Sequence, residues 1–148
     1  MIVLRVLIPN NELVSSVFKL ALTARHIMPR FSSTVKEYAR YPINQGEPET
    51  FDLKGQASVN GSPPFVAIFL RLEEDLVVEA RHTSHGCGVT TAACSVLTEM
   101  AMGKSTQQCL QITCDDLLEE LEGLPPDKQH CAKIATSALH NAVQGGSN

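Results

Sequence analysis

Two segments of the sequence carry side chains that can bind a soft metal ion or sulfur. Cys87 lies between Gly86 and Gly88, and much further along the chain His130 is followed directly by Cys131. Thiolate and imidazole groups are ligands that iron and zinc favour in proteins. A thiolate can also carry an additional sulfur atom as a persulfide. We therefore predict that Cys87, His130 and Cys131 form one site for iron, zinc or persulfide chemistry.

The surroundings of Cys87 favour a reactive thiol over a buried structural one. A predicted strand ends just before Cys87, and a helix rich in Ala and Thr is predicted just after it. The free backbone N–H groups at the start of a helix stabilise a thiolate and lower the pKa of the cysteine. The neighbouring glycines have no side chains that would cover the sulfur. Cys87 is therefore predicted to be a reactive thiol or a metal ligand.

His130 and Cys131 are adjacent, which restricts how they can share a ligand. On a regular helix their side chains would diverge by about 100°, so both can reach one point only from an irregular first turn. Pro125 and Pro126 come just before them and favour such a start. Alone, the pair also fits a capping histidine beside a packed cysteine. The metal-binding interpretation depends on the presence of Cys87.

The remaining cysteines fit structural roles. Cys94 lies about 10 Å beyond Cys87 along a regular helix, too far to bind the same ion, and it fits a helix core. Cys109 and Cys114 have no His or Cys at ligand spacing and are also predicted to be structural thiols. His82 and His85 flank the end of a predicted strand. His85 could reach a site at Cys87, although a solvent-facing ring is the favoured prediction.

The elements that must position these residues follow a simple order. Strands are predicted over residues 53–59, 65–72 and 76–84, and only Glu73-Glu74-Asp75 separates the last two. So short a link requires antiparallel pairing, because a parallel crossover needs about a dozen residues. One face of each later strand is predicted to be buried, with Val66, Ile68, Leu70 and Leu72 on the second strand and Leu76, Val78 and Ala80 on the third.

Helices account for most of the remaining predicted structure. The first is expected to start at Ser32 or Ser33 and to stop before Pro42, with a surface loop over residues 42–52 after it. Four more helices are predicted after Gly86. The first spans residues 89–102, the second is capped by Ser105 with Gln108, and the third is capped by Thr113 with Asp116. The last spans residues 126–143, and its inner stripe consists of Ile134, Ala135, Ala138, Leu139 and Ala142. Strands followed by helices predict an α+β fold.

Length, charge and cysteine usage limit the function. The chain has 148 residues, enough for one core, and a net charge of −4 without a basic stripe, which argues against nucleic-acid binding. No apolar run approaches the roughly 20 residues of a membrane span. The cysteine count of five is odd and no secretory signal precedes them, so we expect free or metal-bound thiols in a reducing cytoplasm.

Residues 1–30 differ in character from the rest of the chain. They contain a strand-like run, Ile2–Ile8, and a helix predicted over residues 12–26, and they are basic. This segment faintly resembles an organelle transit peptide, but an ordinary extra helix or an extension upstream of a start near Met28 is the favoured interpretation. We treat residues 1–30 as an N-terminal extension and residues 31–148 as one domain.

Several linked motifs within residues 31–148 resemble one protein family. They are Tyr41-Pro-x-Asn-x-Gly46, Glu79-Ala-Arg81, His85-Gly-Cys-Gly88, Gly103-Lys-Ser105 and Leu124-Pro-Pro-Asp-Lys-Gln-His-Cys131. Together they resemble the NifU N-terminal / IscU family of iron-sulfur cluster assembly scaffolds. The resemblance implies an α+β fold with a three-stranded antiparallel sheet and helices packed on one side.

The resemblance also implies a function and a set of partners. It implies a scaffold, not an enzyme, that receives iron and a persulfide sulfur from a cysteine desulfurase, builds a transient [2Fe-2S] cluster and passes it to apo iron-sulfur acceptor proteins. By position, Cys87 matches the family's middle cluster cysteine, Cys131 its last and His130 the histidine beside it. Leu124–Lys128 resembles the chaperone-recognition segment, with Asp127 where the bacterial pattern has Val. Zinc is expected to occupy the same ligands in isolated protein.

One family motif is missing from the sequence. The family places its first cysteine and an aspartate in an Ala-Cys-Gly-Asp turn between the first two strands, and here that turn reads Val59-Asn-Gly-Ser-Pro63. With Cys87, His130 and Cys131 alone, one position of a tetrahedral site stays open for water, a carboxylate or a partner's ligand. The two alternatives to a scaffold are a persulfide relay that uses Cys87 and a paralogue that binds partners but no cluster.

Overall fold

The fold follows the predicted order of strands and then helices. The computed structural model describes residues 30–145, and its first element is α3 (Ser33–Arg40). The predicted strand-like run 2–8 and helix 12–26 lie outside the described residues, and the boundary at residue 30 stays a prediction. The other elements are β1 (Leu53–Val59), β2 (Ser62–Glu73), β3 (Leu76–His85), α4 (Gly88–Ala101), α5 (Thr106–Leu110), α6 (Cys114–Glu120), the 3-10 turn η1 (Pro126–Lys128) and α7 (Gln129–Val143).

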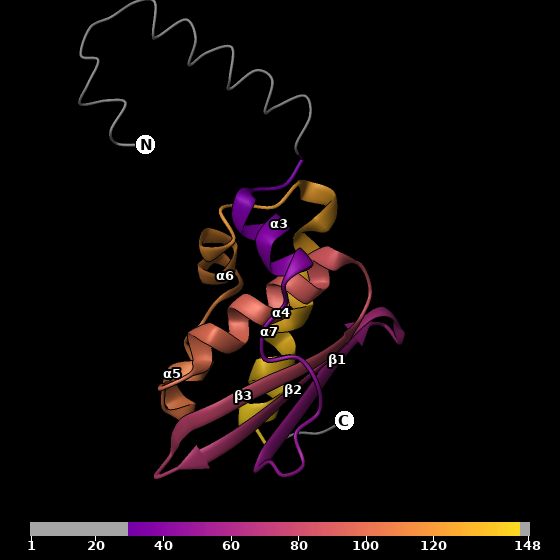
Figure 1. Ribbon diagram of the computed structural model, residues 1–148. Coiled ribbons are helices and arrows are strands. Elements are labelled where there is room, and N and C mark those ends of the chain that lie inside the picture. Colours follow the sequence, from indigo (N-terminus) through magenta and orange to yellow (C-terminus); the bar gives the residue numbers. More distant parts are fainter. Residues whose placement is uncertain (1–29, 146–148) are drawn as a thin grey trace, which may run out of the picture. The chain divides into compact units, whose positions relative to one another are not determined.

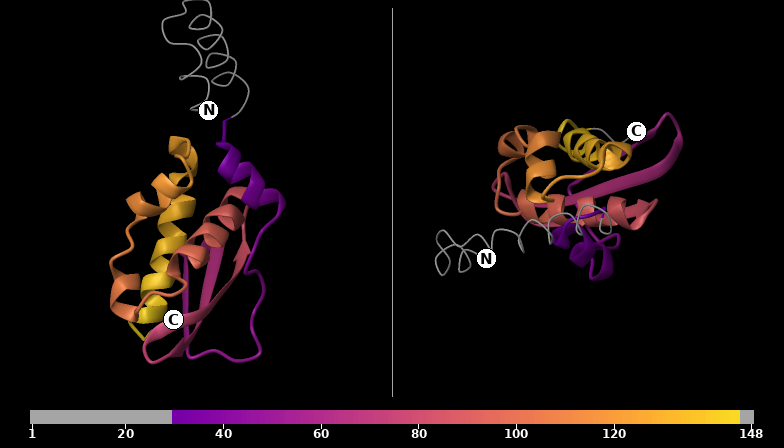
Figure 2. Two further views of the ribbon diagram at one scale, coloured as in Figure 1. Left: turned by 60° about the vertical axis from the view of Figure 1, so that its left-hand side comes forward. Right: turned by 90° about the horizontal axis from the view of Figure 1, so that it is seen from above.

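The three strands form one antiparallel sheet in the order β1-β2-β3. The short link predicted the antiparallel pairing of the last two strands, and the family resemblance implied the three-stranded sheet. Asn60 and Gly61 make the first hairpin turn with φ values of 50° and 79°, a left-handed conformation that Asn and Gly adopt readily. Helices α4 and α7 cross the same face of the sheet (Figures 1 and 2). The predicted α+β fold with helices on one side is therefore confirmed.

The core lies between that face and the two long helices. Val66, Ile68 and Leu70 of β2 are buried there, and Leu72 packs against them at the margin, as predicted. The inner stripe predicted for the last helix is also buried. Gly55 of β1 faces α7 so closely that a Cβ atom would overlap the backbone of Ala138 and Ala142. The sheet and α7 therefore touch backbone to backbone at this point.

The predicted buried face of the third strand was wrong in part. Leu76 is 45% exposed and Val78 is only partly buried, whereas Val77 is 1% exposed and belongs to the core. The pairing of β2 with β3 shifts between Arg71 and Leu72, so that Val78 has no partner in the register. This bulge reverses the inward and outward alternation at the start of β3. Ala80, beyond the bulge, is buried as expected.

Side-chain caps fix the helix starts that the sequence predicted. Ser32 caps α3 by accepting a hydrogen bond from the Val35 backbone N–H. The predicted capping boxes of Ser105 with Gln108 and of Thr113 with Asp116 are both formed. The last helix begins irregularly, since the 3-10 turn η1 precedes α7. Within residues 30–145 no helix is long and apolar enough to cross a membrane.

A buried histidine ties the loop after α3 to the sheet. His82 of β3 is 0% exposed, and its Nε2 lies 3.0 Å from the carbonyl oxygen of Ile43. Its backbone N–H donates to Asn44 and its carbonyl accepts from Gly46. The loop predicted to lie on the surface is therefore partly buried at residues 42–44. His82 Nδ1 has no hydrogen-bond partner among the described residues.

Folding stability is expected to fall in acid because of His82. Burial lowers the pKa of His82 below its ordinary 6.5, and the charge of Arg81 adds to this, against the opposing hydrogen bond to Ile43. Below pH 6.5 the His82 ring therefore binds a proton in the unfolded chain but stays neutral in the folded chain until the pH falls to its lowered pKa. The free energy of unfolding should decrease as the pH falls, by up to about 1.4 kcal/mol per pH unit.

Urea unfolding on both sides of pH 6.5 tests this expectation. The His82→Gln variant, which can keep the hydrogen bond to Ile43, should show a smaller loss of stability in acid than the wild type. His85→Gln is the matched control, because His85 is an exposed histidine of the same strand. If His82→Gln and the wild type lose stability in parallel, His82 is not the responsible group.

Candidate functional site

Cys87 lies in the short connection between the end of β3 and the start of α4. It is the N-cap residue of α4, with φ −93° and ψ 174°, and its carbonyl accepts from the Thr90 N–H at 3.0 Å. Its side chain is exposed. The predicted placement of Cys87 between a strand and a helix is therefore confirmed.

Gly86 brings the first residues of β2 against this connection. A Cβ atom at Gly86 would lie 2.9 Å from Pro64 Cβ and 3.0 Å from Thr90 Oγ1. Both distances are shorter than a normal contact, so a larger residue would push β2 away from the start of α4. The glycine keeps the β1–β2 hairpin and α4 packed together beside Cys87.

Cys131 lies on α7 and faces the same point of α4. Its side chain is 1% exposed, and the Thr90 hydroxyl donates to its sulfur at 3.3 Å. The same hydroxyl oxygen lies 3.8 Å from Cys87 Sγ. Two cysteines far apart in the sequence thus meet across one threonine, as the proposed site requires.

His130 is exposed on the first turn of α7, but its ring points toward Cys131. Its Nε2 lies 3.7 Å from Cys131 Sγ. Regular helix geometry would separate the two side chains, and the 3-10 turn before α7 supplies the irregular start that the sequence predicted. The His130 ring and the Cys131 sulfur therefore lie next to each other at the start of α7.

Lys128 and Thr90 belong to this cluster, and neither was predicted. Lys128 Nζ lies 3.7 Å from Cys87 Sγ. A signal for Thr90 exists in the sequence, because the third residue after an N-cap commonly contacts the cap side chain. A signal for Lys128 is weaker, since its contact with Cys87 joins residues 41 positions apart and depends on tertiary packing.

The two thiols have opposite acid–base properties. Burial alone would raise the pKa of Cys87, but the backbone N–H of Thr90, the Thr90 hydroxyl, the backbone N–H of Val89 and the charge of Lys128 all stabilise its thiolate. Their combined effect lowers the pKa below its ordinary value of 9.0. At Cys131, burial raises the pKa and the neighbouring Cys87 adds to this, against the Thr90 hydrogen bond. Cys87 is therefore the more acidic and the more accessible thiol.

Thr90→Val is expected to slow the alkylation of Cys87. Valine keeps the shape of threonine and the backbone N–H but removes the hydroxyl that stabilises the thiolate. The rate of iodoacetamide labelling at neutral pH should fall about fivefold, or about 1 kcal/mol. This is below the roughly 1.5–3 kcal/mol of a hydrogen bond to a charged group, because the contact is long and the same hydroxyl also serves Cys131. The pH at which labelling becomes fast should also move upward. Thr91→Val is the control, because the Thr91 hydroxyl contacts that of Ser84, and the substitution keeps the Thr91 backbone N–H that donates to the Cys87 carbonyl. Equal rates in both variants would rule out this role for Thr90.

The cluster is not arranged as a ready metal site. Among residues 30–145, no group of three or more His, Cys, Asp or Glu side chains is placed to hold one metal ion. The expectation that Cys87, His130 and Cys131 converge like the ligands of a bound ion is therefore not met by these side-chain positions. Binding would require the side chains of Cys87, His130 and Cys131 to move closer together than they are here. The donor types fit iron or zinc, and their role as ligands stays a prediction.

The other predicted thiols lie apart from this cluster or beneath it. Cys94 is fully buried, and burial raises its pKa to about 12, which makes it inert at neutral pH. Cys109 is buried and Cys114 is partly buried, and all five cysteines are free. The structural roles expected for these three residues agree with their burial.

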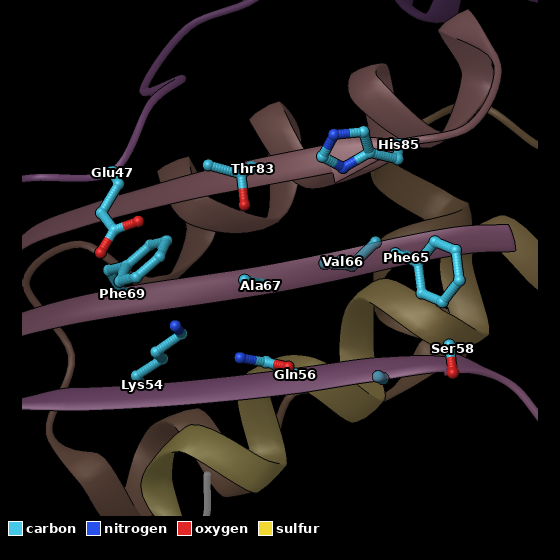
Figure 3. Close-up of a pocket in the computed structure, with 11 residues that line it drawn as sticks. Glu47, Lys54, Gln56, Ser58, Phe65, Val66, Ala67, Phe69, Thr83 and His85 are labelled. Atoms are coloured by element: carbon cyan, nitrogen blue, oxygen red, sulfur yellow. The ribbon is translucent and has the colours of Figure 1, made fainter. Parts of the chain in front are cut away.

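His85 faces the uncovered side of the sheet. It is exposed and lines a shallow groove of about 270 Å³ with Phe65, Ser58, Lys54 and other residues of the three strands (Figure 3). The favoured prediction of a solvent-facing imidazole agrees with this position. The groove lies on the face opposite α4 and α7, so it is separate from the cysteine cluster.

Comparisons with known proteins agree with the resemblance in the sequence. A family model described as the NifU-like N terminal domain matches residues 30–145. The chain is 34% identical over 116 residues to the iron-sulfur cluster assembly scaffold protein IscU of Aquifex aeolicus, covering 77% of this chain and 74% of that protein. It is 31% identical over 117 residues to the Escherichia coli K12 scaffold protein IscU, covering 76% and 91%.

Solved structures support the fold. The N-terminal part of a NifU-like protein from Brucella abortus superposes with a TM-score of 0.61 at 12% identity, covering 77% of this chain and 92% of that one. A candidate iron-sulfur cluster assembly scaffold of the SUF system from Fervidobacterium islandicum gives a TM-score of 0.63 at 16% identity, covering 76% and 96%. At these identities the likeness concerns the fold alone.

Proposed function

The chain belongs to the NifU-like N-terminal domain family, and on this basis we propose that it is an iron-sulfur cluster assembly scaffold. The observation that carries the proposal is the meeting of Cys87 and Cys131 across Thr90, at distances of 3.8 and 3.3 Å from its hydroxyl. The family model covers residues 30–145, which include both cysteines, and relatives named as assembly scaffolds match about three quarters of the chain. The protein would bind and transfer its cargo and would not act as an enzyme.

Cys87, His130 and Cys131 would hold the cargo, which is iron or a labile [2Fe-2S] cluster. Two thiolates and one imidazole leave one position of a tetrahedral iron site open. A water molecule, a carboxylate, a second copy or a partner's cysteine would fill it. The cluster would therefore be held weakly, which suits a protein that must release it. Zinc would occupy the same three residues in isolated protein.

The partners follow from the cargo. A cysteine desulfurase would supply sulfur as a persulfide, and apo iron-sulfur proteins would receive the cluster. The five free thiols fit a reducing compartment, and we place the protein in the cytoplasm. Leu124–Lys128 would be the segment for a chaperone, although Leu124 is buried and Lys128 is directed at Cys87, which leaves little of it free for docking.

A second function, persulfide relay, is favoured by one specific feature. Cys87 is exposed, its pKa is lowered, and Lys128 lies 3.7 Å from its sulfur. An accessible thiolate beside a cation is suited to receive sulfur from a donor and to carry the resulting anion. In this alternative no cluster forms on the protein.

Anaerobic reconstitution separates these functions. The full chain is incubated with ferrous iron, cysteine and a cysteine desulfurase, and visible absorption is recorded together with the intact mass. Sulfur-to-iron charge-transfer bands that elute with the protein support the scaffold. A sulfur adduct on Cys87 without bound iron would instead establish the relay. If neither forms while the desulfurase still binds, the chain is a partner-binding paralogue and the scaffold proposal fails.

A further inference from the structure

The two thiols of the cluster differ in accessibility. Cys87 is exposed at the N-cap of α4, whereas Cys131 is 1% exposed on α7. The Thr90 hydroxyl oxygen lies 3.8 Å from the Cys87 sulfur and 3.3 Å from the Cys131 sulfur. An external reagent is therefore expected to react with Cys87 first, because the Cys131 thiol is buried. Exchange reactions that use two cysteines commonly combine an accessible attacking thiol with a second thiol that resolves the intermediate.

We propose that Cys131 resolves a persulfide formed on Cys87, so that this chain releases sulfide with its own two thiols as the reductant. The inference rests on the proposed function for its sulfur source but adds an activity to it. The substrate is a persulfide of a protein or a small thiol. The products are hydrosulfide and a disulfide between Cys87 and Cys131.

The first step transfers one sulfur atom. The Cys87 thiolate attacks the outer sulfur of the donor persulfide and forms a new S–S bond. The donor's own S–S bond breaks, and the donor thiolate leaves with the electron pair. Nothing is oxidised or reduced overall, because one persulfide replaces another. Lys128, 3.7 Å from Cys87 Sγ, is placed to stabilise the negative charge of the product.

The second step reduces that sulfur. Cys131 loses its proton and attacks Cys87 Sγ, which forms the Cys87–Cys131 bond and breaks the bond to the outer sulfur. The outer sulfur leaves the deprotonated persulfide with the electron pair and takes up the Cys131 proton, so it is released as hydrosulfide. The outer sulfur gains two electrons, and the two cysteine sulfurs lose one each, so the step balances. A dithiol reductant of the thioredoxin class is then required before the next turnover.

The geometry places the resolving thiol close but not yet bonded. Cys87 is an N-cap residue with an exposed side chain, so rotation about its Cα–Cβ bond can turn its sulfur toward α7. Cys131 is buried and its sulfur accepts the hydrogen bond of Thr90, so the exposed Cys87 is the side chain expected to move. Cys94 is 0% exposed, so it is a poor competitor for a sulfur atom carried by the exposed Cys87.

Treatment with glutathione persulfide tests the proposal. The full 148-residue chain is mixed with one equivalent under anaerobic conditions and without iron, and sulfide release, intact mass and disulfide mapping are measured. The wild type should release sulfide and form the Cys87–Cys131 disulfide. Cys131→Ser, which keeps the size of the side chain, should instead accumulate a persulfide on Cys87, with sulfide release at least about tenfold slower. Cys114→Ser should behave as the wild type.

Other results would overturn the inference. A wild-type chain that keeps its persulfide, or that joins Cys131 to Cys94, excludes Cys131 as the resolving thiol. Cys131→Ala serves as a second variant if the serine unfolds the protein, and circular dichroism checks both. Reconstitution with ferrous iron and inorganic sulfide tests the scaffold separately, because it requires no persulfide. If a cluster forms in the reconstitution but no Cys87–Cys131 disulfide forms with glutathione persulfide, only this inference is wrong. If the disulfide forms but the cluster does not, only the scaffold proposal is wrong.

Discussion

Replacing Gly55 with alanine is expected to destabilise the protein by about 3 kcal/mol and to abolish metal binding with it. A Cβ atom at this position would overlap backbone atoms of Ala138 and Ala142, and backbone cannot move aside as a flexible side chain can. Overpacking of a core costs roughly 1–3 kcal/mol, and contact with rigid backbone places this site at the upper end. Helix α7 would have to shift away from β1.

The loss of function would follow from the same shift. Helix α7 carries Cys131, whose sulfur must stay 3.3 Å from Thr90 on α4 to remain beside Cys87. Urea unfolding measures the stability, and a zinc titration measures the site. Gly88→Ala is the matched control for stability, since its Cβ would lie at 3.4 Å from Ala39, an ordinary contact. If Gly55→Ala is as stable as Gly88→Ala, the close packing of α7 on β1 is not essential.

Replacing Asn60 with cysteine is expected to slow the loss of iron to a chelator by about 100-fold. A third thiolate would complete the open tetrahedral position, and even groups outside the ligand shell change metal affinity by roughly 10–100-fold. Asn60 lies in the turn between β1 and β2, and Pro64, just beyond that turn, packs beside Gly86 and hence near Cys87. Its φ of 50° is mildly strained for cysteine, an effect that the turn can tolerate.

A second cysteine variant separates this effect from that of adding any thiol. Ser58→Cys places the thiol on β1, just before the turn, but beside the groove on the uncovered face of the sheet (Figure 3). It should lose iron at the wild-type rate. The ferrous protein is prepared anaerobically and mixed with excess ferrozine, and absorption follows the release. If both variants hold iron equally, the hairpin turn is not next to the site.

The sequence predicted the fold well because the pattern of apolar residues is local. Alternation along β2 and the helix caps at Ser105 and Thr113 depend only on neighbouring residues, and the structure has them where they were expected. The buried face of β3 was missed because a bulge adds one residue to the strand without any change in composition. The role of His82 in holding the loop after α3 also depends on contacts between distant segments.

The site was predictable only in part for the same reason. Cys87 could be placed at a helix start from its flanking residues, and the irregular turn before His130 followed from Pro125 and Pro126. The contacts of Thr90 with Cys131 and of Lys128 with Cys87 join α4 to the start of α7 across the core. Such contacts are set by how the helices pack, and a single sequence does not give that packing.

The most direct test of the site is anaerobic titration with cobalt(II), which replaces iron or zinc and reports its ligands by absorption. We expect one cobalt per chain in tetrahedral geometry. The intensity of the thiolate-to-cobalt charge transfer should fall by about half in Cys87→Ala and by about half in Cys131→Ala, because each single variant removes one of two thiolates. Cys114→Ala should leave the spectrum unchanged. Charge transfer that is unaltered when Cys87 or Cys131 is removed would contradict the claim that these two thiols bind one metal ion.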